Sequence, residues 1–211
     1  MLKKIVMIEQ RILHRGKEYV PFLLANILFG CAVYYMLMAC NLVNDGDGVW
    51  HLSNYVAGIG EISSGRGLLR YVDKLHFGIV SVPFLTFIAL LLFSIANTVM
   101  MAVLKVEGSI LRCLLSFFLI ANPVVCMTLT FSYTAVGYAA AYLFAVLAVV
   151  PFRYFKNMFR IFLCGICIAI SMSCYQAYLG VTCVLLLFLL ICMIREEEKP
   201  LKLLAYMRDA F

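Results

Sequence analysis

Two carboxylates follow the first long apolar run of the chain. Asp45 and Asp47 alternate with glycines in the segment NLVNDGDGVWH, residues 41–51. A carboxylate beside an acceptor hydroxyl can act as a general base, and a pair of carboxylates can instead hold a divalent cation. Alternating Asp and Gly is also ordinary turn chemistry. The segment therefore predicts either a polar turn between two membrane spans or chemistry placed at the membrane surface.

Arg66 is a second candidate group, in the glycine-flanked segment SSGRG, residues 63–67. The glycines predict a tight turn that presents the arginine with little steric cover. A guanidinium fork suits a phosphate or a pyrophosphate. Together with a base on the same face, it would serve transfer of a group from a phosphate-bearing lipid to an acceptor. The alternative is that Arg66 contacts lipid head groups only.

The elements that must position these groups are membrane helices. Of all residues, 65% are hydrophobic and 13% are charged, whereas soluble domains are about half apolar and a quarter charged. The charges form short clusters between long uncharged runs, as in a polytopic membrane protein. The net charge of +6 comes mostly from Lys and Arg beside the apolar runs, where they set topology. We therefore expect membrane lipids, and no nucleic acid, as partners.

The number of spans follows from the lengths of the uncharged runs, because a bilayer core needs about 20 helical residues. A single helix over the uncharged run 113–152 would extend about 60 Å, so this run needs two spans, with a turn at 128–134. The run 161–194 has basic residues on both sides and needs a turn at 171–176. With one span each in 19–44 and 75–104, the sequence predicts an all-α polytopic protein of about six transmembrane helices. Asn122-Pro123 is expected to kink the third span.

The orientation follows from the basic residues of the N-terminus, Lys3, Lys4, Arg11, Arg15 and Lys17. The positive-inside rule places this end in the cytoplasm, and an even number of spans returns the other end there. We expect a basic cytoplasmic N-terminus (1–18), a helix bundle (19–195) with a long outer loop (43–75), and a cytoplasmic tail or the start of a further segment (196–211). Asp45, Asp47 and Arg66 then share the outer face.

The outer loop is predicted to contain helices that lie in the membrane interface. Its segments 49–62 and 67–78 carry apolar residues at near-helical spacing, which suits interfacial amphipathic helices. In the second segment we expect an apolar side and a charged side, formed respectively by Leu68, Leu69, Val72, Leu75 and Phe77, and by Arg70, Asp73 and Lys74.

Three stretches carry a resemblance to a known family. GDGVWHLSNYVAGIGEISSGRGLLRYVDKLHFG, residues 46–78, resembles the first outer loop of the bacterial glucosyltransferase family that includes the O-antigen serotype-converting enzymes. In that family an acidic pair follows the first span, and GR introduces an LLDKL.FG-like segment. NPVVCMTLTFSYTAVGYAAAYLFAVLAV, residues 122–149, resembles its third and fourth spans, and ISMSCYQAYLGV, residues 170–181, resembles its Tyr-Gln at the outer end of a later span.

The resemblance implies a membrane glycosyltransferase of the GT-C type in the bacterial plasma membrane. Such an enzyme takes a hexose, here glucose, from a polyprenyl-phosphate carrier and attaches it to a cell-surface glycan outside. Carried over by position, Asp47 is the catalytic base with Asp45 as its partner, and Arg66 and Arg70 bind the donor phosphate. The sugar or carrier site is lined by Trp50, His51, Tyr133, Tyr175 and Gln176. His51 would orient the carboxylate of Asp47, and its alternative role is that of a solvated turn histidine.

The sequence departs from the pattern of this family in two ways, and it also allows a non-enzymatic function. The acidic motif is Asp-Gly-Asp instead of two adjacent aspartates, so either carboxylate could act, and a divalent cation at the pair stays an option. Family members are about twice as long, so we expect this chain to be their N-terminal half. The alternative is a non-enzymatic membrane protein, either a transporter or a partner of a carrier-lipid flippase. Transporters usually place ionisable groups near the membrane midplane, and here the spans hold only weakly polar residues such as Asn97, which favours surface chemistry.

Overall fold

The computed structural model describes residues 2–43, 46–51, 53–155, 158–195 and 207–208, with side chains described from residue 18 onward. The described residues form helices, turns and a single isolated antiparallel bridge between Asn54 and Ile79. The helices follow in the order α1 (Leu2–Val33), α2 (Tyr35–Ala39), α3 (Asp47–Trp50), α4 (Ile59–Ser63), α5 (Leu69–Leu75), α6 (Val82–Val103), α7 (Ser109–Ile120), α8 (Pro123–Thr130), α9 (Ala135–Leu147), α10 (Val150–Tyr154), α11 (Phe159–Cys174), the 3-10 turn η1 (Gln176–Tyr178) and α12 (Leu179–Arg195).

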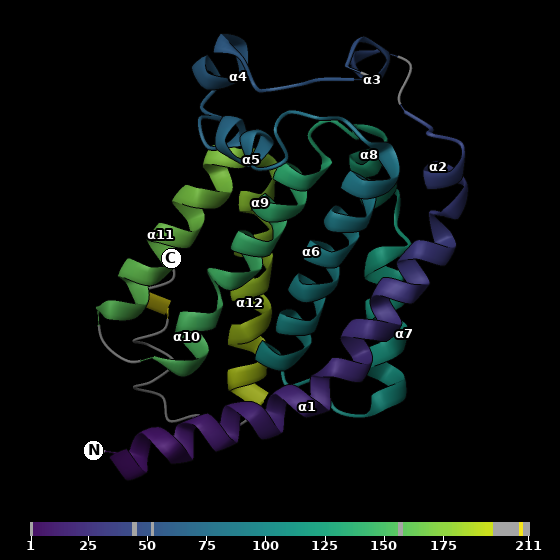
Figure 1. Cartoon of the computed structure of the whole chain (residues 1–211). Helices are drawn as coiled ribbons and strands as arrows, with labels where there is room; N and C mark the ends of the chain where they lie inside the picture. The colour runs from purple at the N-terminus through teal and green to yellow at the C-terminus, as the bar shows by residue number, and fades with distance from the viewer. Residues whose placement is uncertain (1, 44–45, 52, 156–157, 196–206, 209–211) are drawn as a thin grey trace.

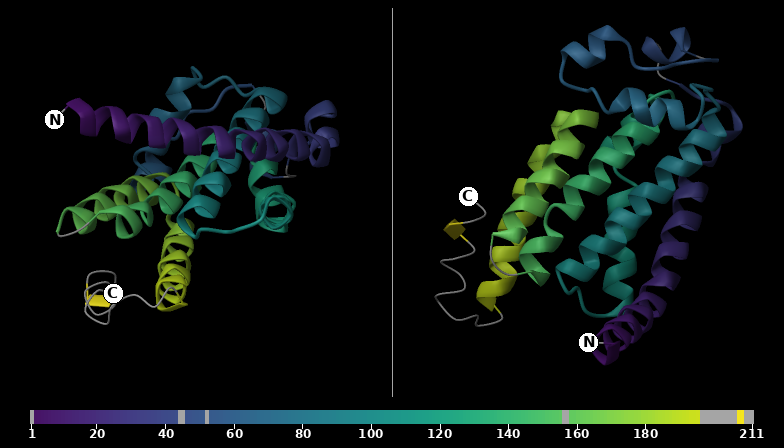
Figure 2. Two further views of the ribbon diagram at one scale, coloured as in Figure 1. Left: turned by 90° about the horizontal axis from the view of Figure 1, so that it is seen from below. Right: turned by 60° about the vertical axis from the view of Figure 1, so that its left-hand side comes forward.

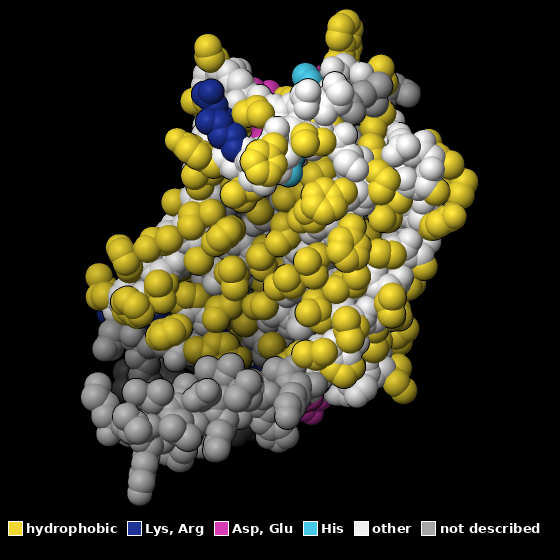
Figure 3. All heavy atoms as spheres, in the orientation of Figure 1, with side chains coloured by type: hydrophobic (Ala, Val, Ile, Leu, Met, Phe, Trp, Pro, Cys, Tyr) yellow, Lys and Arg dark blue, Asp and Glu magenta, His cyan; other side chains and the backbone are white. Residues whose placement is uncertain are grey.

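The long helices run side by side between two ends of the molecule (Figure 1). The short helices α3, α4 and α5 gather at one end, which we call the loop end, and the first part of α1 crosses the opposite end. Figure 2 shows the same separation from a second side. Hydrophobic side chains cover the helices between the two ends on the face in Figure 3, where Lys, Arg and His side chains appear at the loop end. This distribution is typical of a bundle surrounded by lipid.

Three helical stretches are long and apolar enough to cross a membrane: Val82–Val103, Ala135–Tyr154 and Gln176–Arg195. The pair α7 and α8 would make a fourth span, bent by 45°. Two shorter apolar helices, Glu18–Val33 and Phe159–Cys174, cover the first and fifth of the predicted spans. The structure therefore supports an all-helical membrane protein with three or four candidate spans, and the count of six stays a prediction.

The bend between α7 and α8 has a local cause at Asn122 and Pro123. The side-chain oxygen of Asn122 accepts hydrogen bonds from the backbone N–H groups of Val124 (2.9 Å) and Val125 (3.1 Å), which caps α8. Its amide nitrogen donates to the carbonyl of Leu119 in α7. Pro123 lacks an N–H group and fits the first turn of α8. The kink predicted at this dipeptide is confirmed.

Helix α9 is the centre of the bundle and packs against α6, α11 and α12. All but one of its buried positions are alanine or glycine, the exception being Val146, and Ala139, Ala141 and Ala145 are fully buried. Small residues let neighbouring helices approach closely, as in other membrane bundles. At its loop end, a Cβ atom on Gly137 would overlap the side chain of Leu69. The absence of a side chain at Gly137 therefore lets α5 dock on the bundle.

The loop between α2 and α6 contains the helices that the sequence predicted for it, although they are short. The chain also turns within the two predicted segments 128–134 and 171–176, but later than predicted, because α8 extends to Thr130 and α11 to Cys174. The prediction that Asp73 lies on an exposed charged side was wrong. Residues four apart share a helix face, so Asp73 lies below Leu69 and is only 1% exposed, while Leu75 and Phe77 are 81% and 86% exposed.

Candidate functional site

Asp47, the predicted base, lies at the start of α3 and is exposed. Tyr133, on the buried turn between α8 and α9, is close enough for the charge of this carboxylate to act on its hydroxyl group. Burial first, and the negative charge of Asp47 second, raise the pKa of Tyr133 above its ordinary value. Tyr133 therefore stays protonated and offers an O–H donor near the Asp47 carboxylate. Asp45 lies outside the described residues.

Three aromatic rings join the loop to this turn. The ring centroids of His51 and Tyr55 are 4.6 Å apart, those of His51 and Tyr133 are 4.8 Å apart, and those of Tyr55 and Tyr133 are 4.6 Å apart. Edge and tilted contacts at these distances are favourable for aromatic rings. His51 thus packs against Tyr55 and Tyr133, and its predicted role in orienting the Asp47 carboxylate stays a prediction. Trp50 is 85% exposed.

Glu61 is a carboxylate at the loop end that sequence reasoning did not assign to the site. One of its oxygens accepts a hydrogen bond from the Tyr55 hydroxyl (2.9 Å), and the other accepts from the N–H of Gly58 (2.8 Å). Burial opposes its ionisation, but backbone and side-chain hydrogen bonds and the charge of Arg66 lower the pKa of Glu61 overall. Glu61 stands three residues after Gly58, the N-cap of α4, and its bond from the Gly58 N–H is one half of a capping box, because glycine has no side chain for the other half. A glutamate at the third position of a short helix was the signal available in the sequence.

Arg66 is held against the turn between α11 and α12. Its Nε donates to Oε1 of Gln176 (3.3 Å), and its guanidinium lies 5.0 Å from the ring centroid of Tyr175. The amide nitrogen of Gln176 also donates to the carbonyl of Ser64. Gly65 adopts a φ of +86°, which favours glycine. The predicted tight turn is confirmed, and Arg66 is half-buried instead of openly presented.

Glu61 connects the surroundings of Asp47 electrostatically with those of Arg66. Its charge acts on Tyr133 and Tyr138, while the charge of Arg66 acts on Glu61 itself. Tyr138 in turn stacks on Tyr175, with ring centroids 4.2 Å apart. Asp47, Glu61 and Arg66 therefore lie at one end of the bundle, the two carboxylates beside the rings of Tyr55 and Tyr133 and the arginine beside the stacked rings of Tyr138 and Tyr175. Arg70 is exposed in α5, and among the described residues no contact ties it to these rings.

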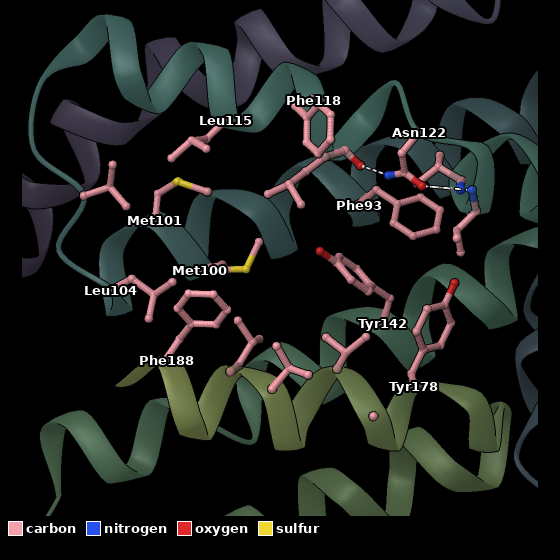
Figure 4. A pocket seen from close by; sticks show the side chains of 18 residues that line it. Phe93, Met100, Met101, Leu104, Leu115, Phe118, Asn122, Tyr142, Tyr178 and Phe188 are labelled. Atoms are coloured by element: carbon pink, nitrogen blue, oxygen red, sulfur yellow. Dashed lines mark hydrogen bonds between the residues drawn. The ribbon is translucent and has the colours of Figure 1, made fainter. Parts of the chain in front are cut away.

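An apolar groove descends from this end into the bundle. Its upper cavity, about 500 Å³, is lined partly by Tyr138 and Tyr175. Its lower cavity, about 620 Å³, lies between α6, α7 and α12, and Figure 4 shows side chains from these helices facing one another across it. The two cavities share Val124, Tyr178 and Val181 as lining residues. The ring of Tyr175, which lies beside Arg66, thus lines the upper of two adjoining apolar cavities.

The comparison with known families decides what kind of protein carries this site. The model of the family Glucosyl transferase GtrII matches residues 35–211. The chain belongs to this glucosyltransferase family. No curated protein and no solved structure matches it.

The GtrII match covers all of the residues that form the candidate site, and the family resemblance predicted from the sequence is confirmed. Membership of a glucosyltransferase family implies a transferase, with a sugar donor and a glycan acceptor in general. Among the described residues, no group of three or more His, Cys, Asp or Glu side chains could hold a metal ion. A divalent cation at Asp45 and Asp47 stays a prediction, because Asp45 lies outside the described residues.

Proposed function

We propose that this GtrII-family chain transfers a hexose, glucose by family membership, from a polyprenyl-phosphate carrier to a cell-surface glycan. In this proposal the protein spans the bacterial plasma membrane six times with both ends in the cytoplasm, and the loop end faces outward. The observation that supports it is that Arg66 lies over the ring of Tyr175, which lines the upper of two adjoining apolar cavities. A phosphate bound by Arg66 would leave its isoprenoid chain at the mouth of a groove of suitable character.

The reaction is a displacement at the anomeric carbon of the sugar. Asp47 accepts the proton of the acceptor hydroxyl, and the acceptor oxygen forms a bond to the anomeric carbon. The bond between that carbon and the phosphate oxygen breaks, and the polyprenyl phosphate leaves with the bonding electrons. Arg66 stabilises the negative charge on the leaving phosphate. Tyr133 and His51 keep the Asp47 carboxylate in place for the acceptor.

The test is sugar transfer in membranes from a radiolabelled polyprenyl-phosphate-glucose pool. We expect transfer with the wild-type chain and a loss of about a hundredfold or more in the Asp47→Asn variant, because a general base contributes about 10²–10⁴-fold. Glu107→Gln, which removes an exposed carboxylate between α6 and α7 at the opposite end, serves as the matched control. Transfer by Asp47→Asn at the wild-type rate would remove the assignment of the base.

The groove also supports a second candidate function, that of a protein that binds the carrier lipid without turnover. In that case neither the wild-type chain nor Asp47→Asn transfers sugar. Both still bind polyprenyl phosphate, and both lose it when Arg66 is replaced by Gln. Binding and transfer measured on the same membranes separate the two functions.

A further inference from the structure

Asp73 is a buried carboxyl group with a structural contact and an unused oxygen. Its Oδ2 accepts a hydrogen bond from the backbone N–H of Ala57 at 2.8 Å, and its side chain is 1% exposed. Its Oδ1 is also buried and has no hydrogen-bond partner in the part of the chain that the structure describes. A buried carboxyl group with one hydrogen bond is costly, so its presence at this position calls for a role.

The group that Asp73 holds is the segment 53–57, which runs alongside residues 78–80. The N–H of Tyr55 donates to the carbonyl of Gly78 (2.7 Å), and the N–H of Val80 donates to the carbonyl of Ser53 (2.9 Å). The N–H of Gly78 donates to the carbonyl of Asp73 itself (2.9 Å). Gly78 has a φ of +67°, and a Cβ atom there would lie 2.9 Å from the carbonyl oxygen of Tyr55. Asp73 thus contributes both its backbone and its side chain to one hydrogen-bonded unit. We call this unit, formed by Asp73, segment 53–57 and residues 78–80, the clasp.

The clasp fixes Tyr55, and Tyr55 leads directly to the proposed base. Its ring contacts the rings of His51 and Tyr133, and the charge of Asp47 acts on the Tyr133 hydroxyl group. Buried rings at centroid distances of 4.6 Å do not move independently. A shift of segment 53–57 is therefore transmitted to Tyr133 and, through His51 at the end of α3, to the helix that carries Asp47.

We propose that Asp73 is a positioning residue for sugar transfer, which acts on Asp47 through Ala57, Tyr55 and the rings of Tyr133 and His51. This inference rests on the proposed function, because the reaction that Asp47 serves is itself proposed. Asp73 touches no reacting atom, so its effect is on the rate of the bound complex and not on binding of the donor.

The surroundings of Asp73 favour the neutral, protonated form of its carboxyl group. The titratable groups that face it are Glu61 of α4, Tyr55 of the segment and Cys174 at the end of α11, while the cations of α5, Arg70 and Lys74, are exposed. Burial raises the pKa of Asp73 from 3.8 to about 7, against the hydrogen bond from Ala57 and with help from the charge of Glu61. Because the folded-state pKa is raised, the clasp is most stable below about pH 4 and loses stability as the pH rises toward 7.

The experiment measures two properties of the same purified variants between pH 5.5 and 8.5. The first is amide hydrogen exchange of the peptide that contains residues 53–57, corrected for intrinsic exchange. The second is sugar transfer. In the wild-type chain we expect protection to fall between pH 5.5 and about 7 and to level off above that, and kcat to fall as the Asp73 carboxyl group ionises near pH 7. Asp73→Asn keeps an acceptor for the Ala57 N–H and cannot ionise, so protection and kcat stay high across the range. Asp73→Leu lacks the acceptor, so we expect rapid exchange at every pH and a kcat at least tenfold lower, with an unchanged KM for the donor. Glu107→Gln should behave as the wild type.

The outcomes separate this inference from the proposed function. If the wild-type chain transfers sugar and Asp73→Leu keeps the same kcat or the same protection, Asp73 does not position the base and only the inference fails. An alkaline decline that persists in Asp73→Asn would overturn the neutral form. Absence of transfer by the wild-type chain would overturn the proposed function, and the catalytic role of Asp73 with it. Loss of protection in α6 and α9 peptides would mark Asp73→Leu as misfolded, and Asp73→Asn then decides the question through its pH profile.

Discussion

Gly137→Ala is expected to destabilise the docking of α5 on the bundle. A Cβ atom at Gly137 would overlap the side chain of Leu69, which is fully buried in a cluster with Tyr55, Leu85 and Tyr133 and would have to displace these neighbours to move. Overpacking of this kind costs about 1–3 kcal/mol. For a chain of this size, about 2 kcal/mol corresponds to a fall in Tm of about 4–8 °C. The measurement is thermal unfolding in detergent, with hydrogen exchange of peptides from residues 67–78 to locate the change.

Two further variants make the test specific for the contact between Gly137 and Leu69. Gly165→Ala, in α11, places a Cβ atom in open space and should be neutral or slightly stabilising, since alanine favours a helix more than glycine does. Leu69→Ala alone should cost about 2–5 kcal/mol through the cavity that it leaves. In the double variant each change relieves the other, so the cost should be smaller than the sum by about 1 kcal/mol or more. Equal behaviour of Gly137→Ala and Gly165→Ala, or strict additivity in the double variant, would refute the docking of α5 through this glycine.

Two predictions concern the donor. Gln176→Leu removes the hydrogen-bond partner of the Arg66 Nε and of the Ser64 carbonyl. The KM for the donor should therefore rise about tenfold, as expected for a lost hydrogen bond to a charged group. Initial rates at varied donor concentration check this, and an unchanged KM would contradict the role of Gln176 in holding Arg66. Val181→Trp fills the junction shared by the two cavities and should weaken binding of polyprenyl phosphate at least tenfold, whereas Leu187→Trp, on the exposed side of the same helix, should not. Equal binding by the two tryptophan variants would show that the groove does not hold the isoprenoid chain.

Features with a local signal could be predicted from the sequence. The turn at Gly65 needs a positive φ, which glycine adopts readily. The bend at Asn122-Pro123 needs a capping side chain and a residue without an N–H group, and these two adjacent residues provide them. The helical composition followed in the same way from the length of the uncharged runs. Those runs do not say where a helix breaks, which is why the fifth predicted span is a helix of 16 residues here.

Features that depend on tertiary contacts could not be predicted. The charge of Asp73 suggested an exposed position, but its place one turn after Leu69 put it on the face that docks on α9. Glu61 and Gln176 looked like surface residues or lining residues, and their hydrogen bonds to Tyr55 and to the 64–66 turn join segments far apart in the sequence. Such pairings appear only when the loop is closed over the bundle.

The short 3-10 turn between α11 and α12 has a mechanical consequence. Tyr175 and Gln176 hold Arg66 from one side of this turn, and Tyr178 separates the upper and lower cavities from the other. We therefore expect a tilt of α12 that widens the lower cavity to shift the guanidinium of Arg66 at the same time. Recognition of the head and of the tail of a lipid would then be cooperative, and substitutions at the two places would combine non-additively.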